Sequence, residues 1–348
     1  MSWSYSENSC LVLSATESLA RDSLRSPLYA AQPSVKVYRM AEKSDPFLTR
    51  IVNPLLPDDS VSVRMERQVP QTSVSYSLRP ASGALGVIID GLNIGKLDTG
   101  EIALIRSLLD EYSVLVFPDQ NLSPEEQIAF TAHFGAVEQH PLYRSAILEG
   151  YPEILVLEHK NHEWVNGRND VWHSDITFSE RPPLGSVLYC RDITEGFGDT
   201  LFCSMRRAYD ALSPGLQTTL ESLSAEHSSA RMVERNNSES YNVPIDDVPP
   251  AVSHPVVRTN KANGKKNLFV NPIYTIRFAD MTEEESDPLL NYLYQQATRP
   301  DNIYRHRWQI NDVVMFDNRC AMHYVVMDYG PEMHRLMHRT TAEGEKPV

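Results

Sequence analysis

The sequence predicts a mainly β fold, a sandwich or barrel with α-helical inserts. After about residue 150, short runs of β-forming residues are separated by Pro, Gly, Asn and Asp, which favours a sandwich or barrel over alternating βαβ units. Helical patterns interrupt these runs at residues 205–223 and 282–297. The predicted strands are residues 153–159, 171–178, 185–193, 199–204, 254–259, 267–271, 303–309, 312–318 and 334–341.

Before residue 150, strands and helices alternate. Segments 83–92 and 113–117 are apolar and rich in Val, Ile and Leu, and each predicts a strand. Segments 98–112 and 123–135 carry apolar residues at helical spacing, and each predicts a helix. Because the alternation does not continue, it does not favour a parallel βαβ sheet for the whole chain.

Capping signals mark the ends of the predicted helices. Ser123 and Glu126 stand in capping-box spacing, and so do Thr282 and Glu285. Gly135 is expected to end the helix that starts after Ser123, since glycine commonly follows the last helical turn.

Length and composition favour one large domain preceded by an extension. A chain of 348 residues that is 41% hydrophobic can bury a sizeable core. Residues 1–80 are rich in Ser, punctuated by Pro and without a sustained hydrophobic period, so we expect a poorly ordered extension there. Residues 81–348 would then form the folded domain.

Charge and cysteine usage exclude several classes of protein. The net charge of −14 argues against a nucleic-acid partner, because such proteins concentrate Lys and Arg into a basic patch. No apolar run approaches the roughly 18 to 20 residues that span a bilayer, so neither a membrane segment nor a secretion signal is expected. The four cysteines lack CxxC spacing, which favours a reducing, cytoplasmic setting. The oligomeric state is left open, a homo-oligomer included.

The stretch VWHSDITF, residues 171–178, predicts half of a metal site. His173 and Asp175 would project from one face of the predicted strand. Two histidines and one carboxylate suit non-haem Fe(II), which must keep positions open for a cosubstrate and dioxygen. A single His-x-Asp arises easily by chance in a chain with 11 histidines, so the interpretation requires a third ligand elsewhere.

The C-terminal region supplies candidates for the missing partners. His323 lies shortly after the strand predicted at residues 312–318. Arg335 and Arg339 are four positions apart in the last predicted strand, so they share one face. Guanidinium forks match carboxylates and sulfonates, and the two arginines could hold two different acids in one pocket.

The order of these motifs resembles the taurine dioxygenase family, whose bacterial taurine and chlorophenoxyacetate dioxygenases use Fe(II) and 2-oxoglutarate. The resemblance extends from about residue 83 to about residue 343 and implies a double-stranded β-helix, or jelly roll, with residues 81–348 as the catalytic domain. It rests on His173-x-Asp175, GDT at 198–200, FDNR at 316–319, His323, HRLMHR at 334–339, and the stretches HFGAVEQHPLY, PPLGSVLYC, AYDALS, HPVVRT and LFVN.

The resemblance also implies catalytic roles. His173, Asp175 and His323 would bind the iron, and 2-oxoglutarate would chelate it through its keto-acid end. Arg335 would pair with the distal carboxylate of this cosubstrate, and the Thr200 hydroxyl would assist. The metal and the cosubstrate then supply the oxidation of a nearby C–H bond, while the protein supplies geometry and electrostatics.

The substrate implied by the resemblance is taurine or a related alkylsulfonate, cleaved with release of sulfite. Sulfonate-binding members hold the substrate anion with the His and Tyr of an HPxY motif, an Asn before the His-x-Asp motif and the last Arg. This sequence has His140, Tyr143, Asn169 and Arg339 at those positions. Their donors can satisfy sulfonate oxygens that are costly to bury unpaired.

Two departures keep other substrates open. Tyr274 stands where the taurine enzymes carry Phe, and its hydroxyl could line the substrate pocket. Residues 233–250 differ from the family in length and composition, and such a loop commonly covers a substrate. The first alternative is the same chemistry on a carboxylate-bearing amino acid or secondary metabolite. A non-catalytic binding module is a further alternative, which the loss of a metal ligand would have supported.

Overall fold

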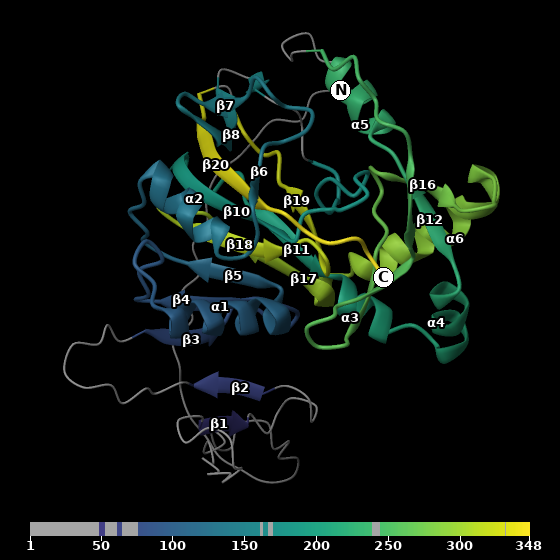
Figure 1. The fold of residues 1–348 in the computed structure, drawn as a ribbon, viewed down its shortest axis with the longest axis horizontal. Coiled ribbons are helices and arrows are strands. Elements are labelled where there is room, and N and C mark those ends of the chain that lie inside the picture. The colour runs from purple at the N-terminus through teal and green to yellow at the C-terminus, as the bar shows by residue number, and fades with distance from the viewer. Residues whose placement is uncertain are drawn as a thin grey trace, which may run out of the picture.

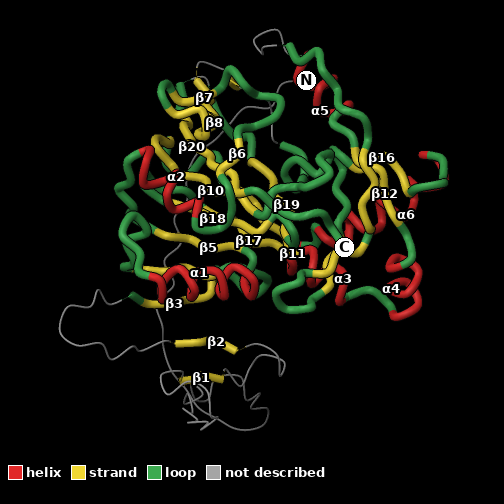
Figure 2. The backbone as a smooth tube through the Cα atoms, viewed as in Figure 1, coloured by secondary structure: helices red, strands yellow, loops and turns green. Residues whose placement is uncertain are grey.

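Two facing β-sheets form the centre of the part of the chain that the computed structural model describes, residues 49–52, 61–64, 76–160, 163–165, 170–238, 244–330 and 332–348. Figure 1 shows these sheets between α1 and α2 on one side and α4 and α6 on the other. Figure 2 shows strands concentrated at the centre and helices towards the outside. The predicted mainly β fold with helical inserts is confirmed, and the arrangement is that of a jelly roll.

The larger sheet has the order β3-β4-β5-β18-β10-β20-β8-β7, with β6 also beside β20 and β9 also beside β8. Apart from the parallel pair β4 and β5, its strands pair antiparallel. Its strands are β3 (Ser77–Pro80), β4 (Val87–Asp90), β5 (Val114–Phe117), β6 (Val137–Glu138), β7 (Ile147–Leu148), β8 (Tyr151–Lys160), β9 (Glu163–Val165), β10 (Gly185–Ile193), β18 (Val313–Asp317) and β20 (Arg335–Ala342).

The smaller sheet has the order β17-β11-β19 and is antiparallel throughout. Its strands are β11 (Thr200–Ser204), β17 (Ile303–His306) and β19 (Ala321–Val325). Phe202 and Tyr304 of this sheet lie in one buried cluster with Leu188 and Phe316 of the larger sheet. The space between the sheets is therefore apolar core, and the site lies at its edge.

The central strands of the larger sheet are buried on both faces, which explains their continuous apolar runs. On one face, Val187 and Val313 pack with the buried leucines of α1. On the opposite face, Leu188 and Val314 point into the core between the sheets. Every residue of β18 is buried, as this two-sided packing requires.

Helices cover the outer face of the larger sheet and the far side of an inserted unit between residues 205 and 297. The inserted unit has its own sheet, with the order β13-β12-β16, and a separate pair, β14 and β15. The helices are α1 (Thr99–Tyr112), α2 (Pro124–Ala132), α3 (Met205–Asp210), α4 (Pro214–Glu221), α5 (Ala230–Asn237), α6 (Glu283–Ala297) and the 3₁₀ turn η1 (Pro300–Asn302). The strands of the unit are β12 (Ser224–His227), β13 (Val252–Pro255), β14 (Val257–Thr259), β15 (Lys266–Leu268) and β16 (Thr275–Phe278).

Both predicted capping boxes are confirmed. Ser123 Oγ accepts from the Glu126 N–H at 3.2 Å, and the Glu126 carboxylate accepts from the Ser123 N–H at 2.8 Å. Thr282 and Glu285 make the same reciprocal pair at 3.2 and 2.9 Å. These caps satisfy amide donors that the first helical turn leaves unpaired.

The prediction that Gly135 ends the second helix is wrong, because α2 ends at Ala132. Gly135 instead lies against the chain after β20. A Cβ atom at this position would come within 2.6 Å of the Glu343 carbonyl oxygen. The glycine therefore permits a close approach of two backbone segments.

The helix predicted over residues 205–223 is two helices, α3 and α4. Ser213 accepts a hydrogen bond from the Leu216 N–H, and Pro214 occupies the first turn of α4. Because proline has no N–H to donate and its ring clashes with a preceding turn, it starts a new helix here and does not continue α3.

The expected extension, residues 1–80, falls mostly outside the described residues. Within the described part, β1 (Thr49–Val52) pairs antiparallel with β2 (Val61–Arg64). Strand β3 pairs with β4, so the larger sheet already includes the last residues assigned to the extension. No helix in the described ranges is long and apolar enough to cross a membrane.

Candidate metal centre and active site

His173, Asp175 and His323 meet at the edge of the core between the two sheets. Each offers one ligand atom, and these atoms all lie within 4.8 Å of one another. All three side chains are buried. Two imidazoles and one carboxylate at this spacing fit a single divalent ion, and the set suits non-haem Fe(II).

Backbone pairing brings the two histidines together. His323 lies in β19, and His173 forms an isolated antiparallel bridge with it. The His173 N–H donates to the His323 carbonyl at 3.0 Å, and the His323 N–H donates to the His173 carbonyl at 2.8 Å. The two imidazole centroids are consequently 4.1 Å apart.

The strand predicted for residues 171–178 is wrong. Only His173 makes a β-bridge, and a turn begins at Asp175. Ile176 has a φ of 52°, a left-handed conformation that is incompatible with a strand. The turn nevertheless keeps Asp175 Oδ1 3.9 Å from His173 Nε2, so the two predicted ligands do face one position.

Hydrogen bonds orient the imidazole of His173. His173 Nδ1 lies 2.7 Å from the Val171 carbonyl oxygen, which can only accept, so this nitrogen carries the proton. His173 Nε2 then presents its lone pair towards Asp175. Burial lowers the pKa values of His173 and His323, which keeps both rings in the neutral form that binds a metal.

Asp175 is held ionised by its surroundings. Burial alone would raise its pKa, but the Arg339 guanidinium, the two neighbouring imidazoles and the Ser186 hydroxyl together outweigh this effect, and the pKa falls well below the usual range. Arg339 Nη1 donates to Asp175 Oδ1 at 2.9 Å. The Ser186 hydroxyl donates to the other carboxylate oxygen at 2.7 Å. Ser186 was not identified from the sequence, where it is one small residue in an apolar strand.

Asn318 clamps the backbone of Asp175, and the sequence assigned it no role. Its Oδ1 accepts from the Asp175 N–H at 2.5 Å, and its Nδ2 donates to the Asp175 carbonyl at 2.6 Å. Asn318 belongs to the FDNR motif between two buried strands. In the sequence, the signal for this role was the position of Asn318 as a polar residue between two buried strands.

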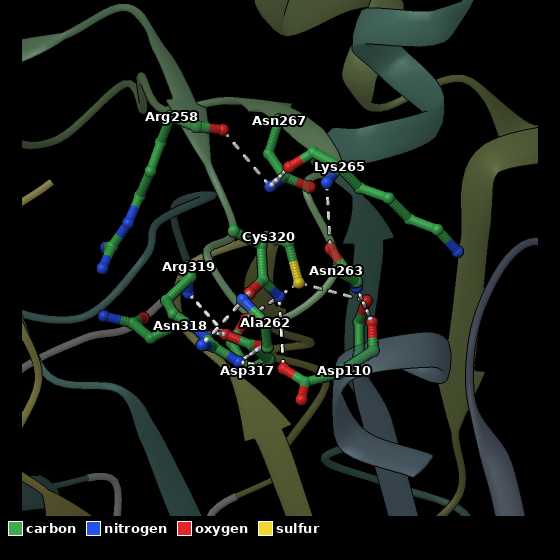
Figure 3. A network of polar contacts seen from close by, with 12 residues as sticks. Asp110, Arg258, Ala262, Asn263, Lys265, Asn267, Asp317, Asn318, Arg319 and Cys320 are labelled. Atoms are coloured by element: carbon green, nitrogen blue, oxygen red, sulfur yellow. Dashed lines mark hydrogen bonds and ion pairs between the residues drawn. The ribbon is translucent and has the colours of Figure 1, made fainter. Parts of the chain in front are cut away.

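The neighbouring residues of that motif fix the turn that carries Asn318 (Figure 3). Arg319 Nε and Nη2 donate to the two carboxylate oxygens of Asp317 at 2.9 and 2.7 Å. Arg319 Nη2 also donates to Asp110 of α1 at 2.7 Å. This bidentate, largely buried pair ties the turn between β18 and β19 to the outer helix layer.

Arg335 lies where a second anion could bind. Its side chain is buried, its Nε donates to the Gly198 carbonyl at 3.3 Å, and no carboxylate of the described residues is within ion-pair distance of it. A buried cation without a counter-charge is costly, so a ligand carboxylate would stabilise this arrangement. Thr200, two residues beyond Gly198, is fully buried, and its hydroxyl oxygen accepts from Trp308 Nε1 at 2.9 Å.

Gly198→Ala should raise the 2-oxoglutarate requirement. Gly198 has a φ of 67°, and a Cβ atom there would lie 1.7 Å from the hydroxyl oxygen of Tyr329. Relieving this clash must displace Tyr329 or the Gly198 carbonyl that accepts from Arg335. We expect the Michaelis constant for 2-oxoglutarate to rise about tenfold, as strain of about 1–3 kcal/mol implies.

Gly196→Ala is the matched control for this measurement. Gly196 has a φ of 86° in the same loop, and a Cβ atom there meets nothing within 4 Å. An equal rise in both variants would show that backbone strain alone, and not the contact with Tyr329, affects the cosubstrate.

Those predicted substrate residues that the structure describes lie in the same region. Burial, and to a lesser extent the Arg339 charge, lowers the pKa of His140 to about 3, so its ring is neutral. His140 Nδ1 accepts from the Leu142 and Tyr143 N–H groups at 3.2 and 3.0 Å, which leaves Nε2 as the donor. The rings of His140 and Tyr143 lie 4.7 Å apart, and the Tyr143 hydroxyl donates to Met232 Sδ at 3.2 Å.

Arg339 and Tyr274 complete the described part of this region. Nε and Nη2 of Arg339 are buried and have no partner among the described residues. Tyr274 is buried in a small cluster with Ile176 and Phe178, and its ring centroid is 6.5 Å from that of His173. Asn169 lies outside the described residues.

Comparisons with known proteins agree with this geometry. Residues 76–341 match the family model described as "Taurine catabolism dioxygenase TauD, TfdA family". The chain is 36% identical over 240 residues to the alpha-ketoglutarate-dependent 2,4-dichlorophenoxyacetate dioxygenase of Cupriavidus pinatubonensis, covering 65% of this chain and 83% of that protein. It is 33% identical over 285 residues to an alkylsulfatase of Acinetobacter baylyi, covering 77% of this chain and 85% of that protein.

A solved structure gives the same result for the fold. The crystal structure of a taurine dioxygenase from Burkholderia xenovorans superposes with a TM-score of 0.66 at 29% identity, covering 79% of this chain and 91% of that one. The family match spans more than half of the chain and includes every residue of the predicted metal centre. The chain therefore belongs to the taurine catabolism dioxygenase TauD, TfdA family, and it is a dioxygenase that uses Fe(II) and 2-oxoglutarate.

Proposed function

We propose that the enzyme hydroxylates taurine or a related alkylsulfonate at the carbon that bears sulfur, and that the product breaks down to an aldehyde and sulfite. The observation that carries this proposal is Arg339, a buried guanidinium beside Asp175 with two donors that have no partner among the described residues. His140 supports it, because its neutral ring presents an Nε2–H donor in the same region. Three directed donors match the oxygens of a sulfonate.

In this proposal, each side chain has a distinct task. His173, Asp175 and His323 hold the iron, and Arg335 with Thr200 holds the distal carboxylate of 2-oxoglutarate. When bound, the iron and the cosubstrate would supply the activation of dioxygen, with 2-oxoglutarate converted to succinate and carbon dioxide. Arg339, His140 and Tyr143 hold the substrate anion, and Asn169 is assigned to the same set from the sequence. Holding the anion brings the adjacent C–H bond to the metal.

A second candidate is the same reaction on another small acid. Tyr274 favours it, because its buried ring lies 6.5 Å from that of His173 and carries a hydroxyl that a sulfonate pocket does not require. The related proteins carry names that refer to a phenoxyacetate and to alkyl sulfates, so a carboxylate or sulfate ester could occupy the same donors.

A substrate panel tests the proposal. The enzyme with Fe(II), 2-oxoglutarate and oxygen should release succinate and sulfite in equal amounts with taurine or another alkylsulfonate. Alkyl sulfates, phenoxyacetate and amino acids form the comparison set, and reactions without a primary substrate measure uncoupled turnover. Succinate formation that is stimulated only by a carboxylate, without sulfite from any sulfonate, would replace the leading proposal by the second.

A further inference from the structure

The turn that presents Asp175 has a conformation that needs outside support. Ile176, the next residue, is β-branched and has a φ of 52°. This region is strongly disfavoured for a β-branched side chain, and such conformations persist only where surrounding contacts determine them. Asn318 holds the turn from one side through the backbone of Asp175. The contacts on the other side come from the inserted unit.

His254 of β13 holds the carbonyl groups of this turn. Its Nε2 lies 3.0 Å from the Thr177 carbonyl oxygen and 2.9 Å from that of Ser179. Because both oxygens can only accept, Nε2 carries a proton and donates to both. Burial lowers the pKa of His254, so Nδ1 is unprotonated. One buried ring thus joins two residues of the turn.

His227 and Asn271 contact the side chain of Thr177 in the same turn. The Thr177 hydroxyl oxygen lies 3.0 Å from His227 Nδ1 and accepts from Asn271 Nδ2 at 3.0 Å. Asn271 Oδ1 in turn accepts from the Tyr274 N–H at 2.9 Å. Thr177, His227 and Asn271 are all almost completely buried. The hydroxyl is therefore surrounded by fixed partners.

Packing alone does not explain these histidines. His227 Nε2 and His254 Nδ1 are buried and have no partner among the described residues. An apolar side chain would fill the same space without leaving a buried polar atom unpaired, which is costly. The presence of histidine despite this unpaired nitrogen indicates that the other nitrogen of each ring is needed. In both rings, that other nitrogen faces the turn after Asp175.

We propose that His254, His227 and Asn271 are positioning residues for Asp175, so that the inserted sheet supports the metal centre. All three lie on the inserted unit, outside both central sheets, whereas His323 lies in β19 of the smaller sheet and His173 bridges to it. Their contacts determine the turn, and the turn aims the carboxylate at the metal position. This inference rests on the proposed metal role of Asp175 and adds the elements that orient it.

The test is metal binding by the full-length protein without cosubstrate. His254→Ala should weaken Mn(II) binding, measured by titration calorimetry, about tenfold or more, in the range that residues supporting metal ligands show. His254→Gln should recover most of the affinity, because its side-chain amide can donate from nearly the same place as Nε2. Amide hydrogen exchange of metal-free His254→Ala should be faster in residues 171–180 than in the wild type.

Leu293→Ala is the matched control. Leu293 is fully buried in α6, within a cluster of the inserted unit that does not include Ile176 or Phe178 of the turn. Leu293→Ala should lower the midpoint temperature of thermal unfolding while leaving the Mn(II) affinity unchanged. If His254→Ala does not fold, Thr177→Val removes the hydroxyl that His227 and Asn271 contact, and it should weaken Mn(II) binding by at least threefold.

The outcomes separate this inference from the proposed function. Failure of the wild-type protein to bind Mn(II) would contradict the assignment of the metal centre itself. Wild-type binding with unchanged affinity in His254→Ala, or in Thr177→Val where that variant replaces it, would overturn the positioning role and leave the metal centre intact. Equal weakening in Leu293→Ala would also overturn it, because general destabilisation would then account for the loss.

Discussion

Asp175→Ala should abolish oxidation of any substrate and most metal binding. The carboxylate is the only acid in the predicted ligand set, and it also pairs with Arg339 at 2.9 Å. Its removal leaves two neutral imidazoles and an uncompensated buried guanidinium, and breaking a buried ion pair in this way costs about 3–5 kcal/mol. Succinate release at saturating Fe(II) and 2-oxoglutarate, together with Mn(II) titration, measures the effect.

Asp301→Ala is the control for Asp175→Ala. Asp301 is an exposed carboxylate that pairs with Arg299 on the surface. Surface ion pairs contribute little, so this variant should keep normal activity and metal affinity. Near-normal turnover by Asp175→Ala would contradict the assignment of the metal centre, whatever the substrate.

Arg335→Ala and Arg339→Ala should impair different ligands although both side chains lie on one face of β20. Arg335 has no carboxylate partner among the described residues, so its loss should raise the 2-oxoglutarate requirement with every primary substrate. Arg339→Ala should weaken binding of the primary substrate and leave a slow, uncoupled conversion of 2-oxoglutarate to succinate. Truncating one partner of a buried charge pair costs about 2 to 5 kcal/mol, so each affinity should fall by more than roughly thirtyfold.

The contact between Arg339 and Asp175 requires a second variant. Arg339→Ala also removes a partner of the metal carboxylate, so a loss of metal affinity would accompany the loss of substrate. His140→Ala separates the two effects, since no hydrogen bond joins His140 to Asp175. It should weaken the sulfonate while leaving Mn(II) affinity unchanged. Normal sulfonate binding by both Arg339→Ala and His140→Ala would exclude the proposed anion pocket while retaining the iron chemistry.

Strand β10 and two helix starts were predicted correctly from local signals in the sequence. Strand β10 has the predicted bounds, and both capping boxes form, because their signals lie within a few residues. The metal triad and the two arginines were named from motif order, and the structure brings the triad together with Arg339 beside Asp175. Their roles stay predictions that the variants above test.

The tertiary structure decided how the site is held together. The run VWHSDITF alternates like a strand, yet it forms a bridge and a turn, because its partners are not local. Asn318 reaches Asp175 across 143 positions of sequence, and His254 reaches Thr177 across 77. Hydrophobic periodicity and capping signals depend only on neighbours along the chain. The sequence by itself therefore determined the residue types of the metal centre, but not the contacts that hold them. The contacts that override local β-preference and aim the carboxylate exist only once the two sheets and the inserted unit have packed.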